Sequence, residues 1–83
     1  MTYQYKPRGV CPNALTFELD GNIIRAVRFE GGCAGNLVGI ANLVEGMDAH
    51  DAIAKIRGIR CGQKPTSCPD QLSKALEEAL AAQ

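Results

Sequence analysis

The spacing of apolar residues changes once along the chain, near residue 30, and this change constrains the fold more than any other feature. Apolar and polar residues alternate through residues 15–19 and, less regularly, through residues 23–29. From Gly35 onward, apolar residues recur three and four positions apart. Alternation is typical of half-buried strands, and the longer spacing is typical of amphipathic helices. Strands followed by helices predict an α+β domain, with the helices packed on one face of an antiparallel sheet.

The strand-forming part contains a strong hairpin signal. Asp20 and Gly21 separate the two alternating runs, and an Asp-Gly pair in this setting favours a tight turn between antiparallel strands. In the second run, one face of the strand is expected to carry Ile23, Val27 and Phe29. Arg25 interrupts that face, so this strand is expected to bulge or to lie near an edge of the sheet. Residues 2–6 also alternate, which predicts a three-stranded antiparallel sheet.

Three helices are predicted in the second half of the chain. The first starts at Gly35 and stops at Gly46, because glycine is the preferred residue just after a helix. The second is capped by Asp48 and ends at Gly58. The third begins around Pro69, since proline suits the first helical turn.

The size and charge of the chain limit its class and its partners. With 83 residues we expect a single domain over residues 1–83, for which disulfides, a bound metal or a homo-oligomer would add stability. Nine basic and nine acidic residues are interspersed, which argues against a nucleic-acid partner and against a polybasic membrane anchor. No apolar run has membrane-spanning length, and the first residues lack the apolar core of a signal peptide. We therefore expect a cytoplasmic protein.

Each of the four cysteines stands next to a glycine or a proline, where an element is expected to begin or end. They are Cys11, Cys33, Cys61 and Cys68. In a reducing compartment such thiols are better explained as metal ligands or redox groups than as disulfides. Cys33 and Cys68 fall at expected helix N-termini, which favour the thiolate form. We predict that the four thiolates meet at one end of the fold and bind a metal, most simply zinc in a closed tetrahedral shell. Ordinary reduced cysteines without a ligand are the alternative.

Several residues near these cysteines are candidate neighbours of the site. They are Asn13, Gly32, Gly35, Lys64, Ser67 and Asp70. The glycines would let the backbone approach the site, and Lys64 would either stabilise a thiolate or an anion or be solvated. His50, the only histidine, lies in a short polar helix and is expected to be solvated. It neighbours no nucleophile, so a Ser-His-Asp triad is not available.

The chain resembles a known family at residues 66–70, which read Thr-Ser-Cys-Pro-Asp. The TSCPD domain is named for these five residues, and the resemblance extends to Gly31-Gly32-Cys33, Gly46-Met47, Gly58-Ile59, Cys61-Gly62 and Gln71-Leu72. Such domains occur alone and at the C-terminal end of cobalamin-dependent ribonucleotide reductases. The resemblance implies a cysteine-ligated metal site and a ribonucleotide reductase or other redox enzyme as partner. It does not imply reductase catalysis, because 83 residues cannot form the large barrel that a reductase requires.

The order of elements and cysteines is also similar to that of iron–sulfur scaffold proteins of the IscU and SufU type. The three ligand cysteines of those proteins match, in order, Cys11, Cys33 and Cys68. Asn13 replaces an aspartate of the scaffolds, Ser67 replaces a histidine found in many of them, and Cys61 is an additional thiol. This similarity implies an alternative function in iron–sulfur cluster assembly or transfer. A thiol redox partner of a reductase is the third possibility.

Overall fold

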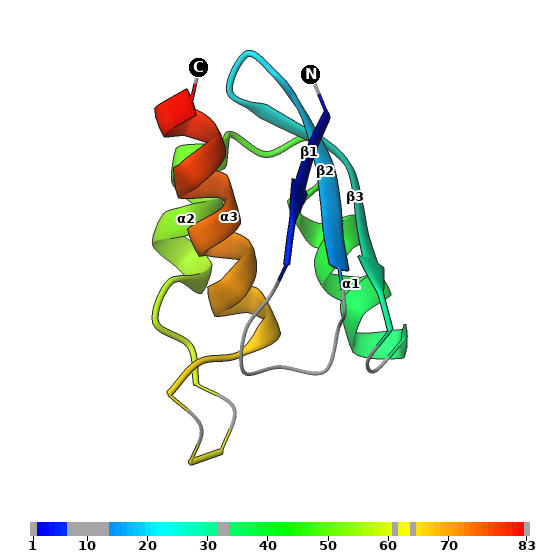
Figure 1. Ribbon diagram of the computed structural model, residues 1–83, viewed down its shortest axis with the longest axis vertical. Helices are drawn as coiled ribbons and strands as arrows, with labels where there is room; N and C mark the ends of the chain where they lie inside the picture. The colour runs from blue at the N-terminus through cyan, green and yellow to red at the C-terminus, as the bar shows by residue number, and fades with distance from the viewer. Residues whose placement is uncertain (1, 7–13, 32–33, 61, 64, 83) are drawn as a thin grey trace.

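The computed structural model describes residues 2–6, 14–31, 34–60, 62–63 and 65–82. Three strands come first in the chain: β1 (Thr2–Tyr5), β2 (Ala14–Asp20) and β3 (Ile23–Glu30). They form an antiparallel sheet in the order β1-β2-β3. Three helices follow: α1 (Ala34–Val44), α2 (Ala49–Ile56) and α3 (Cys68–Ala82) (Figure 1). The predicted α+β fold is confirmed.

One face of the sheet carries the hydrophobic core. Phe17 of β2 pairs with Tyr3 of β1, and their rings stack with centroids 5.6 Å apart. Leu15 lies between Tyr5 and Phe29 in the register of the three strands. This face packs against the buried side chains of the helices, namely Leu37, Val44, Ala49, Ala52, Ile53, Leu72, Ala75, Leu76 and Ala79. The other face of the sheet is largely polar and exposed, as expected for helices that cover one side only.

The hairpin between β2 and β3 is tight, but its turn lies one residue later than the sequence suggested. Asp20 is still in β2 and pairs with Ile23, so the two turn residues are Gly21 and Asn22. Gly21 has a φ of 61°, whereas Asn22 keeps a negative φ. A positive φ at the first central position alone is characteristic of a type II′ turn, and glycine is the preferred residue at that position. The prediction of a turn centred on Asp20 and Gly21 is therefore wrong by one position.

β3 contains a bulge, as the interruption of its apolar face suggested. Thr16 pairs with Arg28 and Glu18 with Arg25, so β3 has one more residue than β2 in this interval. Ala26 lies in this interval and has a φ of 52°, in the left-handed region. Its N–H donates to Oε1 of Glu45 at 2.9 Å, which anchors the bulge to the segment after α1.

The bulge changes which side chains of β3 reach the core. Ile24 is fully buried before the bulge and Val27 is buried after it, although the two are three positions apart. A regular strand would place them on opposite faces. Ile23, expected in the core, is instead half-buried and forms a bridge with Asp48. The predicted face of β3 is thus wrong at Ile23 because the extra residue shifts the alternation.

The helices begin and end where the sequence predicted, to within one or two residues. Gly46 follows α1 with a φ of 82° and donates its N–H to the Ile24 carbonyl at 2.8 Å. Asp48 caps α2 by accepting the His50 N–H at 2.8 Å, and this hydrogen bond is the main cause that lowers the pKa of Asp48. Among the described helices, none combines the length and apolar character needed to cross a membrane.

The two ends of the domain carry different parts of the chain (Figure 1). Tyr5, Ala14 and Glu30 lie at one end. Tyr5 pairs with Leu15, the residue after Ala14, and Ala14 pairs with Glu30. α3 begins at this end with Cys68, so we call it the Cys68 end. The hairpin turn lies at the opposite end together with the start of α2, where the Ala49 N–H donates to the Asn22 carbonyl at 2.7 Å.

Candidate metal centre

Of the four cysteines, Cys68 alone is in the described part of the chain. It is the first residue of α3 and its side chain is half-buried. Helix N-termini present unpaired N–H groups and the positive end of the helix dipole, which favour a thiolate. The predicted position of Cys68 at a helix N-terminus is therefore confirmed, and its role as a metal ligand stays a prediction.

Ser67, rather than Cys68, caps α3. The Ser67 hydroxyl oxygen accepts the Asp70 N–H at 3.2 Å, and the Ser67 carbonyl accepts the Gln71 N–H at 2.8 Å. The same hydroxyl donates to the Ile59 carbonyl at 2.6 Å. Ser67 is 4% exposed. It thus starts the helix and ties it to the segment that leads into Cys61, so it acts on the backbone around the site.

Asp70 is a buried carboxylate whose two oxygens both have partners. Oδ1 accepts the Gly58 N–H at 2.8 Å, and Oδ2 accepts the Thr66 hydroxyl at 2.5 Å. The Lys74 ammonium lies 3.8 Å from Oδ2. The hydrogen bond from Thr66, followed by that from Gly58, lowers the pKa of Asp70 against the opposing effect of burial. Asp70 therefore holds the α2–α3 connection against the start of α3 as an ionised group.

Thr66 extends this network toward the sheet. Its hydroxyl oxygen accepts the Gln71 side-chain N–H at 2.9 Å while donating to Asp70. The Gln71 Oε1 lies 3.4 Å from the Tyr5 hydroxyl, a long hydrogen bond to β1. Among the described residues, no buried side-chain nitrogen or oxygen lacks a hydrogen-bond partner. The network is fully satisfied, as a rigid polar cluster must be.

Sequence reasoning missed the role of Thr66 and gave Asp70 and Ser67 only as neighbours of the site. The signal was present in the spacing. Ser67 and Asp70 are three residues apart, which is the spacing of a capping box, and Thr66 and Asp70 are four apart, one helical turn. In the structure Asp70 uses its carboxylate for Thr66 and Gly58 and offers only its own N–H to Ser67.

Most of the remaining predicted site residues lie outside the described residues. Those outside are Cys11, Asn13, Gly32, Cys33, Cys61 and Lys64. Gly35 is in the first turn of α1. The described residues contain no group of three or more metal-ligating side chains, and they contain one of the four cysteines. Convergence of the four thiols thus stays a prediction.

The described residues next to the other cysteines can be located. Lys6 and Ala14 border the segment with Cys11, Gly31 and Ala34 border that with Cys33, and Arg60 and Gly62 border Cys61. The end of β1, the start of β2, the end of β3, the start of α1 and the described part of the α2–α3 connection lie toward the Cys68 end of the domain (Figure 1). Gly58 and Ile59, at the beginning of the α2–α3 connection, are fixed to the start of α3 by hydrogen bonds to Asp70 and Ser67.

His50 lies away from this end of the domain. It is in the first turn of α2, beside the hairpin turn, with 64% of its side chain exposed. Its Nδ1 is 3.2 Å from Oδ1 of Asp48. The expectation that His50 is solvated is confirmed, and it is not at the end where the cysteines are expected.

Comparison with known proteins identifies the family. No curated protein and no solved structure shows significant similarity to the chain, so the likeness to iron–sulfur scaffolds stays a prediction. The family model of the TSCPD domain matches residues 1–80, which is nearly the whole chain and includes the Thr66 to Asp70 network. The chain therefore belongs to the TSCPD domain family.

Proposed function

We propose that this TSCPD domain is a small metal-binding module in which four thiolates hold one zinc ion. The ligands would be Cys11, Cys33, Cys61 and Cys68. The observation that supports the proposal most is that the elements flanking the other three cysteines reach the Cys68 end, namely the end of β1, the start of β2, the end of β3, the start of α1 and the described part of the α2–α3 connection (Figure 1). A single ion bound by the four cysteines could therefore link these elements to the start of α3.

The surroundings fit a thiolate-bound cation. A zinc ion with four thiolates carries a net charge of about −2, and nearby positive charge stabilises it. Lys6, Arg57 and Arg60 are exposed residues of the connections at this end. The charge of Asp70 is already compensated by its hydrogen bonds and by Lys74. The helix dipole at Cys68 adds a further favourable contribution.

The hydrogen-bond network would pre-organise the ligands. Ser67 and Asp70 fix the backbone on both sides of Cys68, and they also fix Gly58 and Ile59 just before Cys61. Groups that orient metal ligands in this way strengthen metal binding. The zinc ion would supply a structural cross-link, which an 83-residue domain can use to gain stability.

We further propose that the module serves a ribonucleotide reductase or another redox enzyme, and thereby deoxynucleotide synthesis. Membership of the TSCPD family supports this assignment. The 83-residue chain would act as an accessory to that enzyme and not as the catalyst.

Metal analysis with an absorption spectrum tests the proposal. The chain is purified without oxygen and without added metal, and we expect one equivalent of zinc and no visible absorption. Stoichiometric iron with brown colour would support a cluster scaffold instead, and absence of both metals would support a thiol redox role. Each Cys→Ser variant should bind zinc more weakly and retain less than one equivalent, whereas His50→Ala should keep it because His50 lies at the other end of the domain.

A further inference from the structure

The outer edge of β3 is covered over only half of its length. Before the bulge, the Ile24 N–H donates to the Met47 carbonyl at 2.9 Å, and the Ile24 carbonyl accepts the Gly46 N–H at 2.8 Å. After the bulge, the outer edge of residues 27–30 has no backbone hydrogen bond to any other described part of the chain. An open strand edge of this kind is a template for pairing with another strand.

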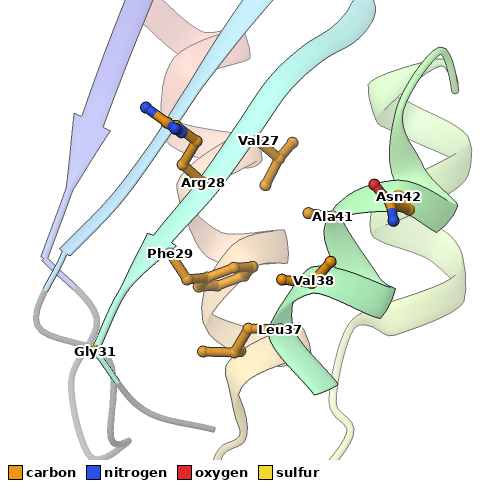
Figure 2. A pocket seen from close by; sticks show the side chains of 8 residues that line it. All are labelled: Val27, Arg28, Phe29, Gly31, Leu37, Val38, Ala41 and Asn42. Atoms are coloured by element: carbon orange, nitrogen blue, oxygen red, sulfur yellow. The ribbon is translucent and has the colours of Figure 1, made fainter. Parts of the chain in front are cut away.

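An apolar groove runs beside this open edge, between β3 and α1. Its volume is about 340 Å³, and its lining is Val27, Arg28, Phe29, Gly31, Leu37, Val38, Ala41 and Asn42. Figure 2 shows the Phe29 ring beside Leu37 and Val38 in the space between strand and helix. Val38 is 58% exposed although it is apolar. The groove is therefore open to solvent along an unpaired strand.

α1 has the composition of a covered helix. None of its 11 residues is charged, and Leu43 is 78% exposed. An uncharged helix with exposed large apolar side chains is typical of a surface that packs against a partner. Val38 of α1 together with Val27 and Phe29 of β3 forms an apolar surface beside the open edge.

The charges on the open half of β3 are complementary to those of a second copy when the two strands pair in one particular register. Arg28 and Glu30 are exposed on the polar face of the sheet, and their partners in β2, Thr16 and Ala14, are uncharged. Neither forms an ion pair with another described residue. Antiparallel pairing centred on Phe29 would place Arg28 opposite Glu30 of the partner subunit, and Glu30 opposite Arg28 of the partner subunit. Pairing centred on Arg28 or Glu30 would oppose like charges.

We propose that the chain forms a two-fold symmetric dimer through antiparallel pairing of the two β3 strands about Phe29. A two-fold axis perpendicular to the sheet keeps both helical layers on the same side. The sheets then join into one of six strands, and the apolar surface of each α1 lies next to the shared edge. This inference does not depend on the metal proposal, because it rests on β3 and α1 alone.

Charge exchange at Arg28 and Glu30 tests the register. Sedimentation equilibrium of the full chain in reducing buffer, which excludes intermolecular disulfides, should give twice the 8.8 kDa monomer mass. Arg28→Glu and Glu30→Arg should each raise the dissociation constant about tenfold or more, because two symmetry-related pairs become repulsive. The double variant Arg28→Glu/Glu30→Arg should restore dimerisation. Glu77→Arg, an exposed change on α3, serves as control and should leave it unchanged.

The proposal fails if the wild-type chain is a monomer up to millimolar concentration. It also fails if both single variants dimerise like the wild type, or if the double variant stays as weak as the singles. Circular dichroism melts of all variants should coincide at a concentration where all are monomeric, because Arg28 and Glu30 lie outside the core. Zinc content is measured on the same samples, so failure of dimerisation and failure of metal binding are seen separately.

Discussion

At the scale of single residues, the signature of this family combines one candidate ligand with a structural cluster. Only Cys68 of the five residues from 66 to 70 carries a thiol. Thr66, Ser67 and Asp70 are buried and hydrogen-bonded to one another or to the preceding connection. The motif is therefore explained largely by the need to hold the α2–α3 connection against the start of α3.

The Thr66 hydroxyl provides a test of this cluster. Thr66→Val keeps the shape of the side chain but leaves a buried carboxylate oxygen of Asp70 without its closest donor. We expect the free energy of unfolding to fall by about 2–3 kcal/mol, since an unsatisfied buried charged acceptor is costly. Thr66→Ser keeps the hydroxyl and should cost about 1 kcal/mol or less. Urea unfolding measures both, and a valine variant as stable as the serine variant would contradict the role assigned to Thr66.

At the scale of elements, the sequence predicted the number, type and order of strands and helices, because hydrophobic spacing and glycine stops are local signals. It misplaced the hairpin turn by one residue and Ile23 by one face. Both errors depend on the pairing of β2 with β3. The bulge at Ala26 is stabilised by Glu45, 19 positions away, which no local pattern reports.

Ala26 offers a test at this scale. Its φ of 52° lies where an L-residue with a Cβ atom is strained. Ala26→Gly should therefore raise the free energy of unfolding by about 0.5–1 kcal/mol. The same change at Ala54, on the exposed side of α2, should lower it by about 1 kcal/mol because glycine weakens a helix interior. Thermal or urea unfolding compares the two variants, and a loss of stability in both would show that Ala26 is not strained.

At the scale of the whole molecule, topology brings the end of β1, the start of β2 and the end of β3 to the same end as the start of α3. The sequence predicted, from the order of cysteines and elements, that the four thiols meet at one end, and this stays a prediction because three of the cysteines lie outside the described residues. The cluster around Asp70 was not predicted as such, because its members come from β1, the α2–α3 connection and α3. Contacts between distant segments leave only a weak trace in one sequence.

A metal that links these connections must contribute to stability. Removing it with a chelator at neutral pH should lower the melting temperature by about 10 °C or more, given the size of zinc-binding energies and of a small domain. Mild acid should act in the same direction, because protonated thiols release the ion. The Cys68→Ser variant is the control: if it no longer binds metal, the chelator should leave its melting temperature unchanged. An unaltered wild-type melt after verified metal removal would contradict the proposed cross-link.

The central claim is that four thiolates share one ion, and X-ray absorption at the zinc edge tests it most directly. The account predicts a first shell of four sulfur atoms at about 2.3 Å from the zinc of the purified chain. The Cys61→Ser variant, reloaded with zinc, should show three sulfur atoms and one oxygen atom in this shell. A shell of nitrogen and oxygen atoms, or a wild-type shell with fewer than four sulfurs, would contradict the claim.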